Sequence, residues 1–171
     1  MAYSVSCTTR APRPGEVDGK HYFFLPEQEF RKRIEAGFFL EYAQVHGHWY
    51  GTPLHPIEQS LEAGKDVILA IDVQGAGRIR TLISGAALAI LKMAFVDVFI
   101  IPPSIKVLKQ RLEGRGQDAE ETIRRRLADS EQELACWQGY RYAIVNDKLD
   151  EAYARLRAII EAEHCRVMPE L

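Results

Sequence analysis

Cysteine is scarce in this sequence, with 3 residues in 171, and none of the three shows a spacing that is typical of metal sites. An odd number of cysteines without a CxxC pair indicates free thiols in a reducing compartment rather than a disulfide scaffold. The first residues, MAYSVSC, also lack the basic and apolar regions of a secretion signal. These absences predict a cytoplasmic protein.

An excess of charge of one sign is lacking as well, since 22 Lys and Arg stand against 24 Asp and Glu, for a net charge of −2. Nucleic-acid-binding domains usually carry a basic surplus, so we expect no nucleic-acid partner. Long apolar runs are also absent, because Ser84, Gly85, Lys92 and Asp97 interrupt the stretch 83–101. This stretch favours buried strand and helix over a membrane span. The 5 histidines complete no metal-ligand set, so we expect no metal held by the protein alone.

Short apolar runs alternate with amphipathic segments along the chain. The runs occupy residues 67–73, 96–101 and 143–145. Buried strands that alternate with helices predict a parallel α/β sheet. A length of 171 residues with 47% hydrophobic content fits one domain, 1–171.

Several helix boundaries can be placed from capping residues. The segment 27–37 has helical periodicity and ends at Gly37, and Ser104 is placed to cap a helix after the second apolar run. Thr52 and Pro53 read as the N-cap and first residue of another helix.

Polar residues stand where two of the apolar runs end. Asp72 ends the first run, and Asn146 follows the third. Ligands of parallel α/β sheets gather beyond the carboxyl ends of the strands, so these side chains are candidates for chemistry. Asp72 has an equally good interpretation as a helix cap or turn residue.

The segment SVSCTTRAPRPGEVDGKHY, residues 4–22, has the composition of a phosphate-binding loop. Pro12 and Pro14 have fixed φ angles, which places Arg10 and Arg13 on a stiff loop rather than on a helix face. Guanidinium groups offer paired donors that match phosphate oxygens. Neutral donors are available from Ser6, Thr8 and Thr9. A solvated basic loop remains the alternative from these residues alone.

The segment 114–127, GRGQDAEETIRRRL, is rich in arginine and begins with two glycines. Glutamates four residues before Arg124 and Arg125 would support an exposed helix. Such pairs do not account for Arg111, Arg115 and Arg126. A glycine-hinged, arginine-rich segment is also typical of a lid that closes over phosphates.

Five strings in this sequence occur in the order and spacing of the guanylate kinase family. The strings are SVSCTTRAPRPGEVDGKHY, FLEYAQVHGHWYGT, VILAIDVQG, RLEGRGQDAEETIRRRL and AIVND. The sequence therefore resembles that family over nearly its whole length. The resemblance implies the three-layer parallel sheet of P-loop nucleoside monophosphate kinases, with a GMP-binding subdomain at about 4–52 and a lid at about 111–130. It also implies phosphoryl transfer from ATP to GMP, giving ADP and GDP, with Mg²⁺.

The resemblance assigns roles to individual residues. The residues similar to ligands of the GMP phosphate are Arg10, Arg13, Tyr22 and Tyr50, with Ser6 close by. Glu41, Thr52 and Asp72 resemble the residues that read guanine, and carboxylates suit its paired N–H donors. The residues similar to ATP ligands are Arg111, Arg115, Arg126 and Asn146, with Arg115 and Arg126 as the catalytic pair.

The sequence departs from the family pattern in three places. The family has a strand, a GxxxxGKS or GxxxxGKT P-loop and a helix before the SVS segment, whereas this sequence starts at Met1, so we expect those elements to be missing. The string at 15–20 is similar to a P-loop only superficially, because three residues separate its glycines. Ala70 replaces an acidic residue two positions before Asp72. We expect the apolar insertion 86–95 to form a substitute strand.

These departures bear on activity, because phosphoryl transfer needs positioned phosphates and fixed positive charge. We expect GMP binding but little or no catalysis by these 171 residues alone. Three alternatives stay open: a reading frame that starts upstream of Met1, a non-catalytic guanylate kinase-like module that binds GMP or a phosphopeptide, and a nonfunctional remnant. Whether ATP binds, and whether the protein is a monomer or a homodimer, also stays open.

Overall fold

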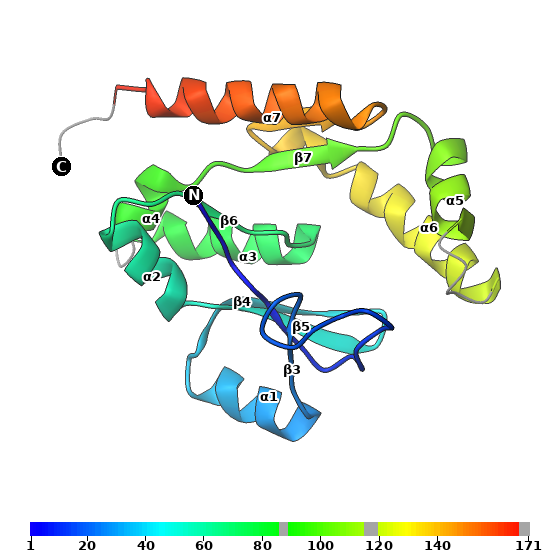
Figure 1. Cartoon of the computed structure of the whole chain (residues 1–171), viewed down its shortest axis with the longest axis horizontal. Helices are drawn as coiled ribbons and strands as arrows, with labels where there is room; N and C mark the ends of the chain where they lie inside the picture. The colour runs from blue at the N-terminus through cyan, green and yellow to red at the C-terminus, as the bar shows by residue number, and fades with distance from the viewer. Residues whose placement is uncertain (86–88, 115–119, 168–171) are drawn as a thin grey trace. The chain divides into compact units, whose positions relative to one another are not determined.

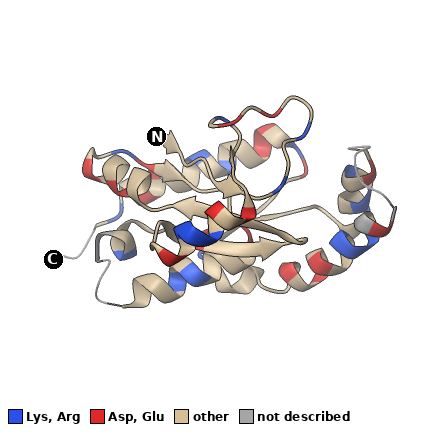
Figure 2. Cartoon of the chain, turned by 90° about the horizontal axis from the view of Figure 1, so that it is seen from below, with Lys and Arg blue, Asp and Glu red and all other residues tan. Residues whose placement is uncertain are grey.

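The structure is a computed structural model that describes residues 1–85, 89–114 and 120–167. The chain divides into two compact units, Met1–Ala89 (unit 1) and Ile90–Leu171 (unit 2), whose elements are labelled in Figure 1. Charged residues of both signs are spread along the helices (Figure 2), in keeping with the small net charge. No helix among the described ranges is both long and apolar enough to cross a membrane.

Unit 1 is built around a four-stranded sheet with the order β3-β2-β5-β4. Its elements are β1 (Ala2–Tyr3), β2 (Cys7–Thr8), β3 (Phe23–Phe24), α1 (Glu27–Glu35), β4 (Phe39–Val45), β5 (His48–Pro53), α2 (His55–Glu62), β6 (Val67–Ile68) and α3 (Val73–Ser84). β4 and β5 form an antiparallel hairpin, and β2 pairs with the other side of β5. The short strands β1 and β6 form a separate parallel pair.

Aromatic packing holds the four-stranded sheet against α1. Phe30 of α1 is fully buried, and its ring stacks on Phe39 of β4 at 4.6 Å between centroids. Cys7 belongs to the same buried cluster, and burial raises the pKa of its thiol to about 11. The four-stranded sheet, whose strand β2 belongs to residues 4–22 (the phosphate-loop segment), therefore has a core within unit 1.

Unit 2 contains a two-stranded parallel sheet and four α-helices among its described residues. Its elements are α4 (Ala89–Ala94), β7 (Val98–Ile101), α5 (Ile105–Gly114), α6 (Glu120–Leu134), a 3-10 turn (Trp137–Gly139), β8 (Tyr142–Val145) and α7 (Leu149–His164). Phe99 of β7 and Ile144 of β8 are its buried strand residues. Tyr142 donates a 2.7 Å hydrogen bond to Glu163, which joins β8 to α7.

Several boundaries predicted from the sequence are confirmed. α1 is followed by Gly37 at φ 66°, β7 lies within the apolar run 96–101, and β8 covers the run 143–145. The hydroxyl of Ser104 accepts a 3.2 Å hydrogen bond from the amide of Val107, as expected for a helix cap.

Three predictions about secondary structure are wrong in whole or in part. Thr52 and Pro53 end strand β5 instead of starting a helix, and α2 begins later, at His55. The run 67–73 forms a parallel strand as expected, but only at Val67–Ile68; residues 69–72 lie outside any strand, and α3 begins at Val73. The expected substitute strand at 86–95 contains helix α4, whose alanine, leucine, lysine and methionine residues favour helix. Residues 86–88 of that prediction lie outside the described residues.

Candidate functional site

A cavity of about 230 Å³ lies within unit 1. Its walls are formed by Ser6, Tyr22, Glu41, Ala43, Val45, Tyr50, Ala70, Ile71 and Asp72. Five of these residues, Ser6, Tyr22, Glu41, Tyr50 and Asp72, are candidate GMP ligands from the sequence. The structure therefore brings together side chains that lie as much as 66 positions apart, since Ser6 and Asp72 line the same space.

Glu41 and Thr52 form a buried polar pair in the β4–β5 hairpin. Their Cα positions are partners across the two strands, and the Thr52 hydroxyl donates a 2.5 Å hydrogen bond to Glu41 Oε1. Glu41 is 5% exposed, and Thr52 is fully buried. Thr52 fixes one carboxylate oxygen of Glu41 and does not itself line the cavity.

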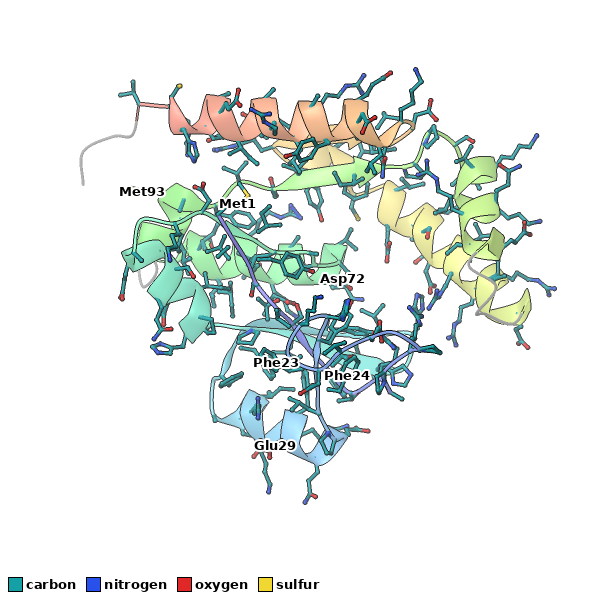
Figure 3. The ribbon with its side chains drawn as sticks, viewed as in Figure 1. Met1, Phe23, Phe24, Glu29, Asp72 and Met93 are labelled. Atoms are coloured by element: carbon teal, nitrogen blue, oxygen red, sulfur yellow. The ribbon has the colours of Figure 1, made fainter. Side chains whose placement is uncertain are left out.

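Asp72 presents a second carboxylate at the beginning of α3, where Figure 3 labels it. Its Oδ1 accepts a 2.8 Å hydrogen bond from the amide of Gly75, so Asp72 is indeed the N-cap of the helix. Its Oδ2 is buried and has no hydrogen-bond partner among the described residues. The cap interpretation of Asp72 is therefore confirmed, and its second oxygen is available to a ligand in the cavity, so its role in ligand binding stays a prediction.

The environment of Glu41 opposes its ionisation. Burial raises the pKa of Glu41 above its ordinary value, and the nearby Asp72 carboxylate adds to this effect. The hydrogen bond from Thr52 and the positive charge of Arg78 act in the opposite direction. Arg78, on α3, lies with its guanidinium carbon 4.4 Å from the centre of the Tyr42 ring. A ligand that donates hydrogen bonds to Glu41 would favour the ionised carboxylate.

Gly75 is a residue of this site that the sequence analysis did not identify. A Cβ atom at position 75 would lie 2.5 Å from Glu41 Oε2 and 3.2 Å from Asp72 Oδ1. The first turn of α3 therefore accommodates Glu41 only because residue 75 has no side chain. The nearest sequence signal was the string VQG, directly after Asp72.

Arg10 is held on the phosphate-loop segment by several contacts. Its Nη2 donates to both carboxylate oxygens of Glu16, at 2.8 and 3.0 Å, and its Nη1 donates to the carbonyl of Ala11 at 2.6 Å. Its guanidinium carbon lies 5.6 Å from the ring centre of Tyr22. The hydrogen bond with Glu16 is the main cause of a raised pKa of Arg10. The Tyr50 side chain contributes to the same increase. The arginine is thus positioned beside two cavity-lining tyrosines.

The threonines of the loop have a different role from the expected one. The Thr8 hydroxyl donates a 3.0 Å hydrogen bond to the carbonyl of Trp49, and Thr9 Oγ1 accepts one of 2.9 Å from the amide of Trp49. Thr8 also accepts from the amide of Arg10. These hydroxyls tie the loop to β5. The Thr8 hydroxyl already donates to Trp49, so the prediction that it is a donor for a phosphate is wrong, whereas Thr9 only accepts and its donor role stays a prediction. Arg13 is half-buried, and its backbone amide donates to Glu16 at 2.6 Å.

The candidate ATP ligands belong to unit 2. Arg111 of α5 is exposed and donates a 3.3 Å hydrogen bond to the carbonyl of Asp147, and Arg126 of α6 is half-buried. The backbone amide of Asn146 donates to the carbonyl of Ile101 where β7 and β8 end. Arg115 lies outside the described residues. In the ranges that the structure describes, no three His, Cys, Asp or Glu residues form a group that could hold a metal ion.

Comparisons with known proteins agree on one family. The guanylate kinase family model matches residues 1–163. Guanylate kinase from Jannaschia sp. is 46% identical over 166 residues, covering 97% of this chain and 73% of the relative. Guanylate kinase from Symbiobacterium thermophilum is 47% identical over 168 residues, covering 98% and 75%. The match begins at residue 1, and so does not support the expectation that an N-terminal strand, P-loop and first helix are missing.

The fold comparison points the same way. The crystal structure of guanylate kinase from Anaplasma phagocytophilum aligns with a TM-score of 0.79 and 32% identity, covering 96% of this chain and 77% of that one. The predicted α/β fold of the P-loop kinase type is thereby confirmed. The sequence, the family match and the structural neighbour all lead to one conclusion: this chain belongs to the guanylate kinase family.

Proposed function

We propose that the chain binds GMP in the unit 1 cavity, as the acceptor of a phosphoryl group from ATP. The observation that carries this proposal is the pair of carboxylates at one cavity, with Glu41 buried and Asp72 Oδ2 unpartnered among the described residues. Guanine offers neighbouring N–H donors on its N1 and N2 edge, which two carboxylates can accept. Adenine has an acceptor at N1, so the same carboxylates would remain unsatisfied.

The phosphate of GMP would lie toward the loop side of the cavity. Tyr22 and Tyr50 line the cavity with their rings 5.9 Å apart, and Arg10 lies over the Tyr22 ring. An arginine and two tyrosine hydroxyls supply one charged and two neutral donors, which suits a phosphate monoester. Arg13, on the same loop, would add a second positive charge.

The donor side would rest on Arg111, Arg115, Arg126 and Asn146, with Arg115 and Arg126 neutralising charge on the transferring group. We expect Mg²⁺ to arrive with ATP, because magnesium in kinases is held largely by substrate phosphates. The 171 residues contain no GxxxxGKS or GxxxxGKT string, whose backbone and lysine cradle the ATP phosphates in P-loop enzymes. We therefore propose that this chain alone binds GMP well and turns over slowly or not at all.

Calorimetric titration with GMP and AMP tests the binding proposal. We expect GMP to bind and AMP to bind at least roughly 10³-fold more weakly, since a site built for guanine donors leaves buried carboxylates unpaired with adenine. Equal and weak binding of both nucleotides would reject the proposal. Binding of phosphopeptides with no preference for guanine would instead support a non-catalytic binding module.

A coupled assay of ADP release tests the turnover proposal separately. With saturating ATP, GMP and Mg²⁺, we expect a rate at least about 10³-fold below the median enzyme turnover of roughly 10 per second, because these 171 residues contain no P-loop string to anchor the donor phosphates. Turnover at an ordinary enzyme rate would show that the 171 residues position ATP by other means.

A further inference from the structure

Glu16 occupies a central place in the contacts of the phosphate-loop segment. It follows a turn at Gly15, where φ is 85°, and its amide donates to the carbonyl of Arg13 at 3.0 Å. This turn directs the carboxylate back toward the preceding residues. Its two oxygens accept from Nη2 of Arg10 at 2.8 and 3.0 Å, and Oε2 also accepts from the amide of Arg13 at 2.6 Å.

The Glu16–Arg10 pair differs from the other glutamate–arginine pairs of unit 1 in its burial. The side chains of Arg10 and Glu16 are 13% and 18% exposed, whereas those of Arg31 and Glu27 in α1 are 58% and 57% exposed. An exposed pair competes with water and exchanges between conformations, so it fixes little. A shielded pair whose carboxylate also holds a backbone amide restricts the arginine far more.

Arg10 is restrained from more than one direction. The Ala11 carbonyl accepts from Nη1 at 2.6 Å, and the rings of Tyr22 and Phe24 lie 5.6 and 5.9 Å from the guanidinium carbon. An arginine side chain has many rotamers, and ordering it upon ligand binding reduces affinity. Here the ordering is already present in the chain without a ligand, and Glu16 makes more of these hydrogen bonds than any other partner that the structure describes.

We propose that Glu16 is a positioning residue for the GMP phosphate, which holds Arg10 in place and joins it to the backbone at Arg13. The inference rests on the proposed function, because it takes the unit 1 cavity to bind GMP. A rival effect exists, since the negative charge of Glu16 also repels phosphate. The two effects predict opposite outcomes when the carboxylate is kept but shortened.

The decisive variant is Glu16→Asp. It keeps the negative charge but shortens the side chain by one methylene, so that the carboxylate can no longer reach Arg10. We expect GMP affinity to fall roughly tenfold, the effect of weakening one charge-assisted contact, while guanosine affinity stays within about twofold. Calorimetry for GMP and an NMR titration for guanosine give the two values. The matched control is Glu27→Asp, which shortens the exposed pair and should change neither affinity.

A double-mutant cycle tests whether Glu16 acts through Arg10. In an Arg10→Ala background, we expect Glu16→Asp to change GMP affinity by less than about twofold, because the group that it positions is gone. An equal loss in both backgrounds would overturn the positioning role. Tighter GMP binding by Glu16→Asp would overturn it too, and would show that the carboxylate competes with phosphate.

Failure of this inference can be distinguished from failure of the proposed function. If the unmodified chain shows no preference for GMP over AMP, the proposed function is rejected. If it prefers GMP but Glu16→Asp binds GMP and guanosine as the unmodified chain does, only the role of Glu16 is rejected. A parallel loss of both ligands would indicate disturbed folding, and would also reject a role confined to the phosphate.

Discussion

The two units of this chain hold their candidate site residues in different ways. In unit 1, a buried hydrogen bond joins Glu41 to Thr52, and a half-buried one fixes Asp72, before any ligand is present. In unit 2, the candidate donor-side residues Arg111 and Arg126 lie on helices. Arg111 is exposed and, among the described residues, donates a 3.3 Å hydrogen bond to the carbonyl of Asp147. Pre-ordered groups give affinity and specificity, whereas groups on exposed helices gain their order from the ligand.

This difference matches the two ligands that the units are proposed to recognise, guanine in unit 1 and a triphosphate in unit 2. Guanine must be distinguished from adenine by the placement of a few hydrogen-bond acceptors, which requires rigid and buried groups. A triphosphate is recognised mainly by charge, which arginines on a helix can supply without fixed geometry. The predictions below test this division, in order of decreasing effect.

The largest effect is expected from removing the aromatic core of unit 1. Phe30→Ala should lower the free energy of unfolding by about 3–5 kcal/mol, because Phe30 is fully buried and stacks on Phe39. Phe38→Ala, at a ring 37% exposed, should cost about 1 kcal/mol. Denaturant melts give both values. Hydrogen exchange should show lost protection in β4 and β5 and unchanged protection in β7 and β8; a uniform loss across both units would contradict the division.

Asp72→Asn is expected to have the next largest effect. The amide oxygen can keep the cap on Gly75, but the amide NH₂ then replaces the available Oδ2 with a donor that faces the guanine donors. We expect GMP affinity to fall roughly 10²–10³-fold and the preference for GMP over AMP to fall with it. Competitive calorimetry measures both. Retained preference for GMP would remove Asp72 from guanine recognition.

Gly75→Ala should reduce GMP affinity about 10- to 100-fold, because the new Cβ would lie 2.5 Å from Glu41 Oε2 and would displace that carboxylate. Gly77→Ala is the matched control, since a Cβ at position 77 meets no heavy atom within 4 Å. Titration of both variants with GMP makes the comparison. Equal affinities would mean that Glu41 does not need its present position.

These residues show the limits of reading the site from the sequence. The resemblance to a family identified Glu41 and Asp72, because their strings stand in a fixed order. It did not identify Gly75 or Arg78, whose importance comes from contact with a strand more than 30 positions earlier in the chain. Local patterns cannot report such contacts.

The secondary structure shows both where local sequence rules succeed and where they fail. Local rules were sufficient where the chain is governed locally, as at Gly37 and at the Ser104 cap. They failed at Thr52-Pro53, where a cap-like dipeptide is held in β5 by pairing with β4. Tertiary contacts outweighed the local preference there.

The smallest effect is expected at Arg78, which opposes the rise in the pKa of Glu41. Folding keeps Glu41 protonated to higher pH than the ordinary value of 4.5, so its contribution to stability decreases as pH rises above that value. In the proposed complex GMP binds the ionised carboxylate of Glu41, so GMP affinity should increase over the same range. Arg78→Gln should move this increase to higher pH and change affinity at pH 7 by less than about threefold. An unshifted pH profile, equal to that of the control Arg155→Gln, would exclude a role for Arg78.

The central claim is that unit 1 alone carries the recognition of GMP. An NMR titration of the ¹⁵N-labelled chain with GMP tests it most directly, since each amide reports its own surroundings. We predict that the largest shifts occur at Ser6, Tyr50, Asp72 and Gly75, while the amides of β7 and β8 stay unchanged. Shifts confined to α5 and α6, or no shifts at saturating GMP, would contradict the account.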